Sequence, residues 1–207
     1  METKLPAIFD GEVVTIVGGG VSLSGFDFSR LQKPVIAINS SFIQCDCHVV
    51  VAIDPPWEKK FMKELDAFDG LKISYNGRNM HSFHEVFIEP SPEPFSEDWC
   101  ILKSNLSGFF ALSLAFHLGA SRVILLGFDG GYEGERPTYY DNPSEGVTRS
   151  SYENANEHYD VFKLPYWNRI LNVGLDSKIE SFPKMDIDSD FYSRFPSKKQ
   201  DINKINI

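Results

Sequence analysis

A glycine-rich turn directly after a predicted buried strand is the clearest candidate for chemistry in this sequence. The apolar run 13–17 (VVTIV) leads into Gly18, Gly19 and Gly20, and Ser22 follows two residues later. Glycines let the backbone come close to a ligand, and the N–H groups of such a turn are donors for an anion. The pattern predicts a phosphate-binding turn. A purely structural tight turn stays open as the alternative, because the spacing matches neither GxGxxG nor the P-loop motif.

Polar residues stand where further apolar strands are predicted to end. They are Asn39 and Ser40 after 35–38, Asp54 after 47–53, and Asp129 shortly after 122–126. Because the carboxyl ends of parallel strands meet at one edge of a sheet, we expect these residues to share the edge at which open α/β sheets bind ligands. Asp129 could contact a ribose hydroxyl or a cation there, or it could only cap its own turn, since Asp-Gly is ordinary turn chemistry.

A helix of small and apolar residues is predicted just before the strand 122–126. The segment 104–120 begins with the capping residues of SNLSG and closes on a helix-ending glycine, Gly119. Ser107 and Gly108 belong to a stripe of small side chains that permits close packing. The free amides at the start of this helix would be available to a phosphate.

The alternation of apolar strands with helical segments predicts an α/β fold. Nearly continuous apolar strands are typical of a parallel sheet that is covered on both faces, and a further helix and short strand are expected at 57–68 and 71–74. We therefore expect one Rossmann-like domain over residues 1–207, with a mostly parallel sheet and an irregular C-terminal lid. Its expected parts are a nucleotide-binding core over 13–132, the lid over 133–166 and a tail over 184–207.

The composition restricts the class of partner. The formal net charge of −9 disfavours tight, non-specific binding to nucleic acid, which needs a basic face to replace counterions. No stretch approaches the roughly 20 apolar residues that a membrane span needs, and the N-terminus lacks a signal-peptide pattern. A soluble cytoplasmic protein is expected. Three cysteines are too few for a disulfide framework, and their spacing predicts no metal site.

Four segments, taken in order, resemble the sialyltransferase-like superfamily: VTIVGGGVSLSGFDFSRLQ, AINSSF, AIDPPW and LSGFFALSLAFHLGASRVILLGFDGGY. This superfamily includes bacterial CMP-sialic-acid-dependent sialyltransferases that modify lipooligosaccharide. It also includes archaeal hydroxymethyl-dihydropterin pyrophosphokinases and flagellin-modification proteins, and many uncharacterised members look phage-encoded. The resemblance covers roughly residues 13–132 and implies a nucleotide-sugar-dependent glycosyltransferase.

The resemblance also implies roles for the polar residues at the sheet edge. The donor phosphate would lie on Gly18, Gly19, Gly20 and Ser22, the nucleoside at Asn39 and Ser40, and the nucleotide close to Ser107 and Gly108. Asp54 stands where the sialyltransferases have an asparagine that contacts the donor, and Gly19 replaces the asparagine of their turn. These two differences put CMP-sialic acid itself in doubt as the donor.

Sugar transfer from a nucleotide needs a base for the acceptor hydroxyl and hydrogen-bond donors for the departing phosphate. His158, in the segment NEHY, is similar to the stretch near the general base of the sialyltransferases. Tyr139 and Tyr140 lie about where those enzymes place leaving-group tyrosines in a lid. A hydrogen-bonded histidine without a catalytic role is the alternative for His158.

Two other functions stay open. One is a nucleotide-binding protein that sequesters or senses a nucleotide without transfer chemistry. The other is magnesium-dependent phosphoryl or pyrophosphoryl transfer, in which Asp54 or Asp129 would hold the metal. The glycosyltransferase needs no cofactor beyond its nucleotide-sugar substrate, and the resemblance is compatible with a homo-oligomer.

Overall fold

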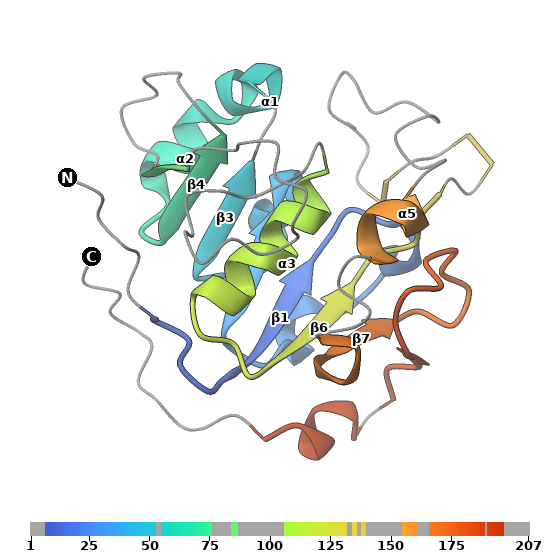
Figure 1. Ribbon diagram of the computed structural model, residues 1–207. Coiled ribbons are helices and arrows are strands. Elements are labelled where there is room, and N and C mark those ends of the chain that lie inside the picture. The colour runs from blue at the N-terminus through green and yellow to red at the C-terminus, as the bar shows by residue number, and fades with distance from the viewer. Residues whose placement is uncertain are drawn as a thin grey trace.

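One parallel sheet organises the described part of the chain (Figure 1). The computed structural model describes residues 7–52, 55–75, 84–86, 106–131, 134–135, 138–139, 155–160, 166–188 and 190–196. Within them, eight strands have the order β5-β4-β3-β2-β1-β6-β7-β8, and all seven neighbouring pairs are parallel. The strands are β1 (Val13–Val17), β2 (Val35–Ile38), β3 (Val49–Ala52), β4 (Leu71–Tyr75), β5 (His84–Val86), β6 (Arg122–Leu126), β7 (Ile170–Val173) and β8 (Lys184–Met185). The predicted α/β fold with a parallel sheet is confirmed.

The strand order reverses at β1, which lies between β2 and β6. At this point Val17, the last residue of β1, pairs with Ala37 of β2 on one side and with Leu126 of β6 on the other. The chain therefore builds the sheet outward from β1 to β5 and then returns to the opposite side of β1 to continue with β6. The carboxyl ends of β1 and β6 form the switch point at which open α/β sheets bind ligands.

Side chains of the central strands alternate between two cores, one on each face of the sheet. On β1, Val14 and Ile16 belong to the core beneath the helix α3 (Ser107–His117), whereas Val17 belongs to the core of the opposite face. In Figure 1, α3 crosses the sheet in front of β1 to β3. Burial on both faces explains why the strands read as continuous apolar runs.

Shorter helices lie at the ends of the strands and on both faces of the sheet. The α-helices are α1 (Pro55–Lys60), α2 (Met62–Ala67) and α5 (Ala155–Asp160); the 3-10 helices are η1 (Val21–Leu23), η2 (Phe28–Arg30), η3 (Asn39–Ile43), η4 (Trp167–Arg169) and η5 (Phe191–Arg194). The expected tail thus includes β8 and η5, and its Phe191 is fully buried against the second face. No helix among the described residues has the length and apolar character to cross a membrane.

The helix expected over 57–68 is two helices. Between α1 and α2, Phe61 leaves the helical conformation with φ −106° and ψ 21°. Its ring lies 5.0 Å from that of Trp57 and 6.4 Å from that of Phe42. The strands β5, β7 and β8 were not expected, because β5 and β8 have only three and two residues and the apolar run of β7 is interrupted by Asn172.

Candidate functional site

The glycine turn after β1 is hydrogen-bonded to the chain that leaves β6. The Gly18 N–H donates to the Leu126 carbonyl at 2.7 Å, and the Gly20 N–H donates to the Gly127 carbonyl at 2.8 Å. A Cβ at Gly18 would lie 2.7 Å from the Gly127 oxygen, and one at Gly20 would lie 2.5 Å from the Asp129 carboxyl carbon. Glycine is required here because the two strand exits pass so close to each other.

Asp129 caps the first turn of η1. Its Oδ2 accepts from the Ser22 N–H at 2.8 Å, and its Oδ1 accepts from the Ser22 hydroxyl at 2.5 Å. The Asp129 carboxylate therefore accepts from the two Ser22 donors that a phosphate-binding turn would otherwise offer to its ligand. Within the described residues, no group accepts a hydrogen bond from the Gly19 N–H.

The end of β2 meets the glycine turn from the other side. Asn39 has φ +49°, which is uncommon for a residue other than glycine, and its buried Oδ1 receives no hydrogen bond from the described residues. The Ser41 hydroxyl donates to the Gly18 carbonyl at 2.7 Å, and the Trp57 Nε1–H donates to the Ser40 hydroxyl at 2.9 Å. These bonds fix η3 between the turn and α1. The structure therefore brings Asn39 and Ser40 to the edge where they were expected.

Tyr139 reaches the same turn from a distant part of the sequence. Its N–H donates to the Gly19 carbonyl at 3.0 Å, and its ring lies 5.7 Å from that of Phe28. Burial raises the pKa of the Tyr139 phenol to about 12, against a smaller lowering effect of hydrogen bonding with Ser41. The hydroxyl is therefore protonated over the physiological range, as a hydrogen-bond donor must be.

The short helix α5 lies beside the beginning of α3, beyond the carboxyl ends of β1 and β6 (Figure 1). A Cβ at Gly108 would collide with the Tyr159 hydroxyl and lie 2.8 Å from the Phe128 ring. Tyr159 is 4% exposed, with its ring 5.8 Å from that of Phe182. The absence of a side chain at Gly108 thus lets α5 pack closely against α3, and α5 contains His158. The structure brings the segments of these two predicted site residues together.

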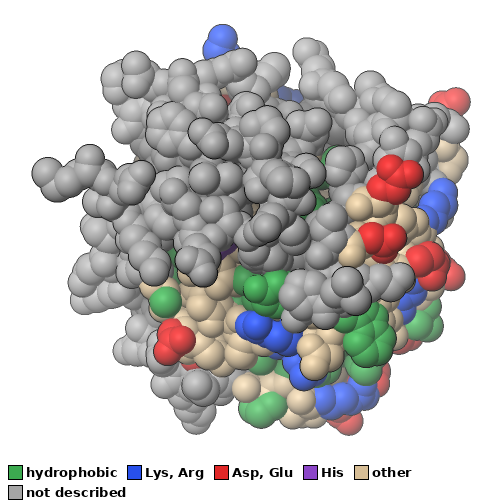
Figure 2. Space-filling model, in the orientation of Figure 1, with side chains coloured by type: hydrophobic (Ala, Val, Ile, Leu, Met, Phe, Trp, Pro, Cys, Tyr) green, Lys and Arg blue, Asp and Glu red, His purple; other side chains and the backbone are tan. Residues whose placement is uncertain are grey.

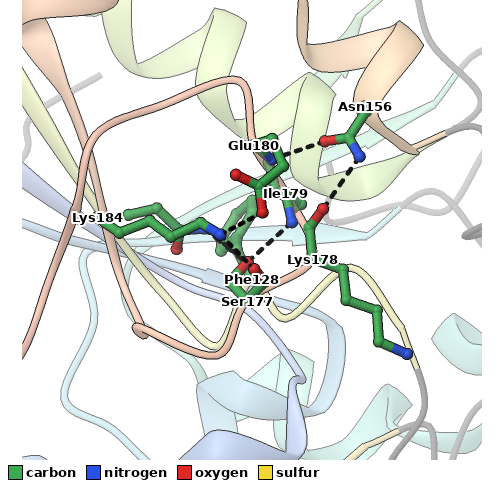
Figure 3. A network of polar contacts seen from close by, with 8 residues as sticks. Phe128, Asn156, Ser177, Lys178, Ile179, Glu180 and Lys184 are labelled. Atoms are coloured by element: carbon green, nitrogen blue, oxygen red, sulfur yellow. Dashed lines mark hydrogen bonds and ion pairs between the residues drawn. The ribbon is translucent and has the colours of Figure 1, made fainter.

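A polar network attaches α5 to the connection between β7 and β8 (Figure 3). The Asn156 side chain donates to the Lys178 carbonyl at 3.0 Å and accepts from the Glu180 N–H at 2.8 Å. In turn the Ser177 hydroxyl donates to the Phe128 carbonyl at 2.6 Å. The chain after β6 and the helix α5 are therefore held by one short segment, 177–180.

Sequence reasoning missed this network. The side chain of Asn172, on β7, donates to the Ser177 hydroxyl at 2.9 Å and is fully buried. A polar residue inside the apolar run 170–173 is the signal that could have indicated it, because a buried amide needs hydrogen-bond partners. No spacing in the sequence indicates that Asn156 contacts 178–180.

Two of the predicted site residues, Asp54 and Tyr140, lie outside the described residues. Among the residues that the structure does describe, no group of three or more His, Cys, Asp or Glu side chains is placed to hold a metal ion. Both oxygens of Asp129 accept from Ser22, so a metal at Asp129 would have to displace these bonds or share the oxygens with them.

Comparison with known proteins adds a structural neighbour. Neither a protein-family model nor a curated protein matches the sequence. Among solved structures, the fold matches that of the sialyltransferase CstII from Campylobacter jejuni, solved in complex with a substrate analogue, cytidine-5'-monophosphate. The TM-score is 0.51 and the sequence identity is 13%. In fold, this chain resembles a sialyltransferase. The match covers 90% of this chain and 98% of the sialyltransferase, and at this identity it shows the fold alone.

Proposed function

We propose that this chain is a glycosyltransferase that moves a sugar from a nucleotide donor to an acceptor hydroxyl. The observation that carries the proposal is the convergence of Gly19, Tyr139 and α5 at the switch point of the sheet. The solved sialyltransferase of similar fold was bound to CMP, which supports a nucleotide as the ligand of this fold. The described part of the face in Figure 2 has Lys or Arg side chains beside Asp or Glu side chains, which suits a small ligand better than a nucleic acid.

In this proposal the nucleotide lies along the carboxyl edge, with its nucleoside at Asn39 and Ser40. Its phosphate lies at the glycine turn, whose Gly19 N–H is available, and near the beginning of α3 at Ser107 and Gly108. Gly18, Gly20 and Ser22 give the turn its shape through their bonds to β6 and Asp129. The buried Asn39 Oδ1 is an acceptor that an amino group of a base can satisfy.

The catalytic groups come from the segment after β6. His158 is the proposed general base, which takes the proton of the acceptor hydroxyl as that oxygen attacks the sugar. Tyr139 and Tyr140 are the proposed donors to the departing phosphate. The contact of Tyr139 with Gly19 supports this role, because it places the residue beside the turn at which the phosphate is proposed to lie.

The Asp129 carboxylate favours a donor with one phosphate. It holds the two donors of Ser22 and places a negative charge beside the turn. A second phosphate would add charge repulsion of a few kcal/mol at about 4 Å, taking an effective dielectric constant near 20. We therefore propose a nucleoside monophosphate sugar of the CMP type, with the sugar itself unspecified.

Nucleotide binding and turnover test the proposal separately. CMP should raise the melting temperature without Mg²⁺, since a ligand that binds only the folded state stabilises it, and CDP and UDP should do so less. His158→Ala should bind CMP normally and lose transfer from a CMP-sugar by about 100-fold or more. Glu157→Gln, an exposed neighbour on the same helix, is the matched control and should retain activity.

The outcomes separate the alternatives. CMP binding without transfer would favour a nucleotide-sequestering or nucleotide-sensing protein. A shift with ATP that requires Mg²⁺ would favour phosphoryl transfer. Full transfer activity in His158→Ala would show that His158 is not the general base.

A further inference from the structure

A cavity of about 490 Å³ lies at the carboxyl ends of β6, β7 and β8. Ser22 and Asp129 form its border toward the glycine turn, and the segment after β7, from Gly174 to Lys178, forms its outer wall. Its volume is typical of a small-molecule site. The nucleotide proposed above has its nucleoside at the end of β2 and its phosphate at the end of β1, so it leaves the part of this cavity beyond β6 unused.

The cavity has an apolar floor and a mixed rim. Leu23, Leu126 and Val173 are buried at its base, whereas Leu175 is 60% exposed at its mouth. The ring of Phe26 also lines it. Apolar and aromatic side chains of this kind suit the apolar face of a sugar ring, whose hydroxyls then need polar partners at the edges.

Charge in the cavity is unbalanced. Its carboxylates are those of Asp129, Asp176 and Asp186, against the single ammonium group of Lys178. Within the described residues, the Asp176 carboxylate has no hydrogen-bond donor or ion-pair partner. Carboxylates accept hydrogen bonds from hydroxyl and ammonium groups and repel other anions. The cavity therefore fits a neutral or amine-bearing sugar and disfavours an acidic one.

We propose that this cavity is the acceptor subsite and that the acceptor is a neutral or amine-bearing carbohydrate. The inference rests on the proposed function and adds an order along the carboxyl edge: nucleoside at β2, phosphate at β1, acceptor at β6 to β8. In the transfer, the acceptor oxygen bonds to the anomeric carbon of the donor sugar as the bond to the phosphate oxygen breaks. The hydroxyl proton goes to His158, and the bonding electrons leave with the nucleotide phosphate.

Direct binding tests the cavity without requiring turnover. Saturation-transfer NMR on the full chain would compare galactose, glucosamine and N-acetylneuraminic acid as probes. We expect binding of galactose and glucosamine, and binding of N-acetylneuraminic acid that is weaker by about tenfold or more. Asp176→Lys should weaken glucosamine binding about fivefold or more and should strengthen binding of the acidic sugar.

The matched control carries the same charge change elsewhere. Asp66→Lys, at an exposed position of α2 near β4, toward the opposite edge of the sheet from the cavity, should leave binding of all three sugars unchanged (Figure 1). Equal binding of the acidic and the neutral sugars, no binding of any probe, or no effect of Asp176→Lys would each overturn the inference.

Kinetics with the CMP-sugar donor distinguish failure of the acceptor-subsite inference from failure of the proposed glycosyltransferase function. If the cavity is the acceptor subsite, Asp176→Lys raises the KM for the acceptor about fivefold or more and leaves the affinity for CMP unchanged. Transfer that proceeds with an unchanged acceptor KM would overturn the subsite and keep the glycosyltransferase. Selective sugar binding in a chain that neither binds CMP nor transfers sugar would instead overturn the proposed function.

Discussion

Individual residues at the switch point make contacts within the glycine turn that their residue types alone do not predict. Ser22 was expected to hold phosphate, and in the structure both its N–H and its hydroxyl donate to Asp129. Asp129 was expected to contact a ligand or to cap its own turn, whereas in the structure its carboxylate accepts from Ser22 in η1, 107 residues away. An aspartate that caps a helix can also set the charge of the adjacent site, because its carboxylate stays close to any anion bound there.

Tyr139 gives a prediction on alkaline pH. Its folded pKa of about 12 lies above the value of 10 for an unperturbed phenol, so the folded state keeps a proton that the unfolded state releases. The stabilisation is full below pH 10 and is lost as the pH rises toward 12. Discounted for partial exposure, this loss is on the order of 1–2 kcal/mol in the free energy of unfolding. Urea unfolding at about pH 9 and pH 11 measures it.

The matched variant is Tyr139→Phe, which keeps the ring beside Phe28 and removes the titrating group. Its stability should fall less than that of the parent protein between the two pH values. Parallel losses in both proteins would show that the phenol of Tyr139 is not the group responsible.

At the scale of elements, two contacts place α5 at the beginning of α3. One is the close packing of Tyr159 against Gly108, and the other is the pair of hydrogen bonds between Asn156 and the segment 178–180. Because α5 has six residues, its own backbone hydrogen bonds cannot keep it folded, and tertiary contacts must do so. The position of His158 in the fold therefore depends on packing and hydrogen bonds made by its neighbours in α5, Asn156 and Tyr159.

Gly108→Ala tests the packing contact. Alanine favours a helix over glycine by about 1 kcal/mol, yet its Cβ would collide with the Tyr159 hydroxyl. We expect a net loss of about 1–3 kcal/mol in the free energy of unfolding, measured by urea denaturation. Adding Tyr159→Phe, which removes that hydroxyl, should recover part of the loss. A stabilised Gly108→Ala variant would contradict the packing explanation.

Asn156→Ala tests the hydrogen-bonded contact. It removes the bonds to the Lys178 carbonyl and the Glu180 N–H and should cost about 1–2 kcal/mol. Amide hydrogen exchange over 155–160 should become faster, with exchange in β1 unchanged if the opening is local. Glu157→Ala, one residue further along the same helix and exposed, should leave that exchange unaffected. Equal exchange over 155–160 in the parent protein, Asn156→Ala and Glu157→Ala would show that the Asn156 hydrogen bonds do not hold α5 in place.

At the scale of the whole molecule, the chain covers the two faces of its sheet differently. The long helix α3 covers one face. On the second face, the C-terminal helix η5 packs into the core, with Phe191 fully buried and Phe195 9% exposed. The Gln32 side chain donates to the Phe195 carbonyl at 3.1 Å, which attaches this C-terminal segment near the N-terminal end of β2. The C-terminal segment is therefore part of the core.

Phe191→Ala should destabilise the whole domain. Truncating a fully buried phenylalanine costs about 3–5 kcal/mol, and both the melting temperature and the urea midpoint should fall in one cooperative transition. Trp167→Ala, at an aromatic side chain that is 49% exposed, is the control and should cost much less. A separate early transition in Phe191→Ala would show that η5 unfolds independently of the sheet.

The sequence by itself determined the central strands, their parallel arrangement and the glycine turn at the end of β1. It could do so because the runs 13–17, 35–38 and 122–126 are nearly continuously apolar, and burial on both faces of a parallel sheet demands that composition locally. The same local reasoning located α3, whose residues are small and apolar. It could not separate α1 from α2, because the break at Phe61 coincides with ring packing against Phe42.

Only the tertiary structure decided what these residues contact. That Asp129 reaches Ser22, 107 residues away, and that Tyr139 reaches Gly19 follows from the return of the chain to the far side of β1. The same holds for Asn156 and the segment 178–180, which no periodicity connects. Local sequence patterns indicate which side chains are buried, whereas the strand order decides which distant segments come into contact. The candidate site consists almost entirely of contacts between such distant segments.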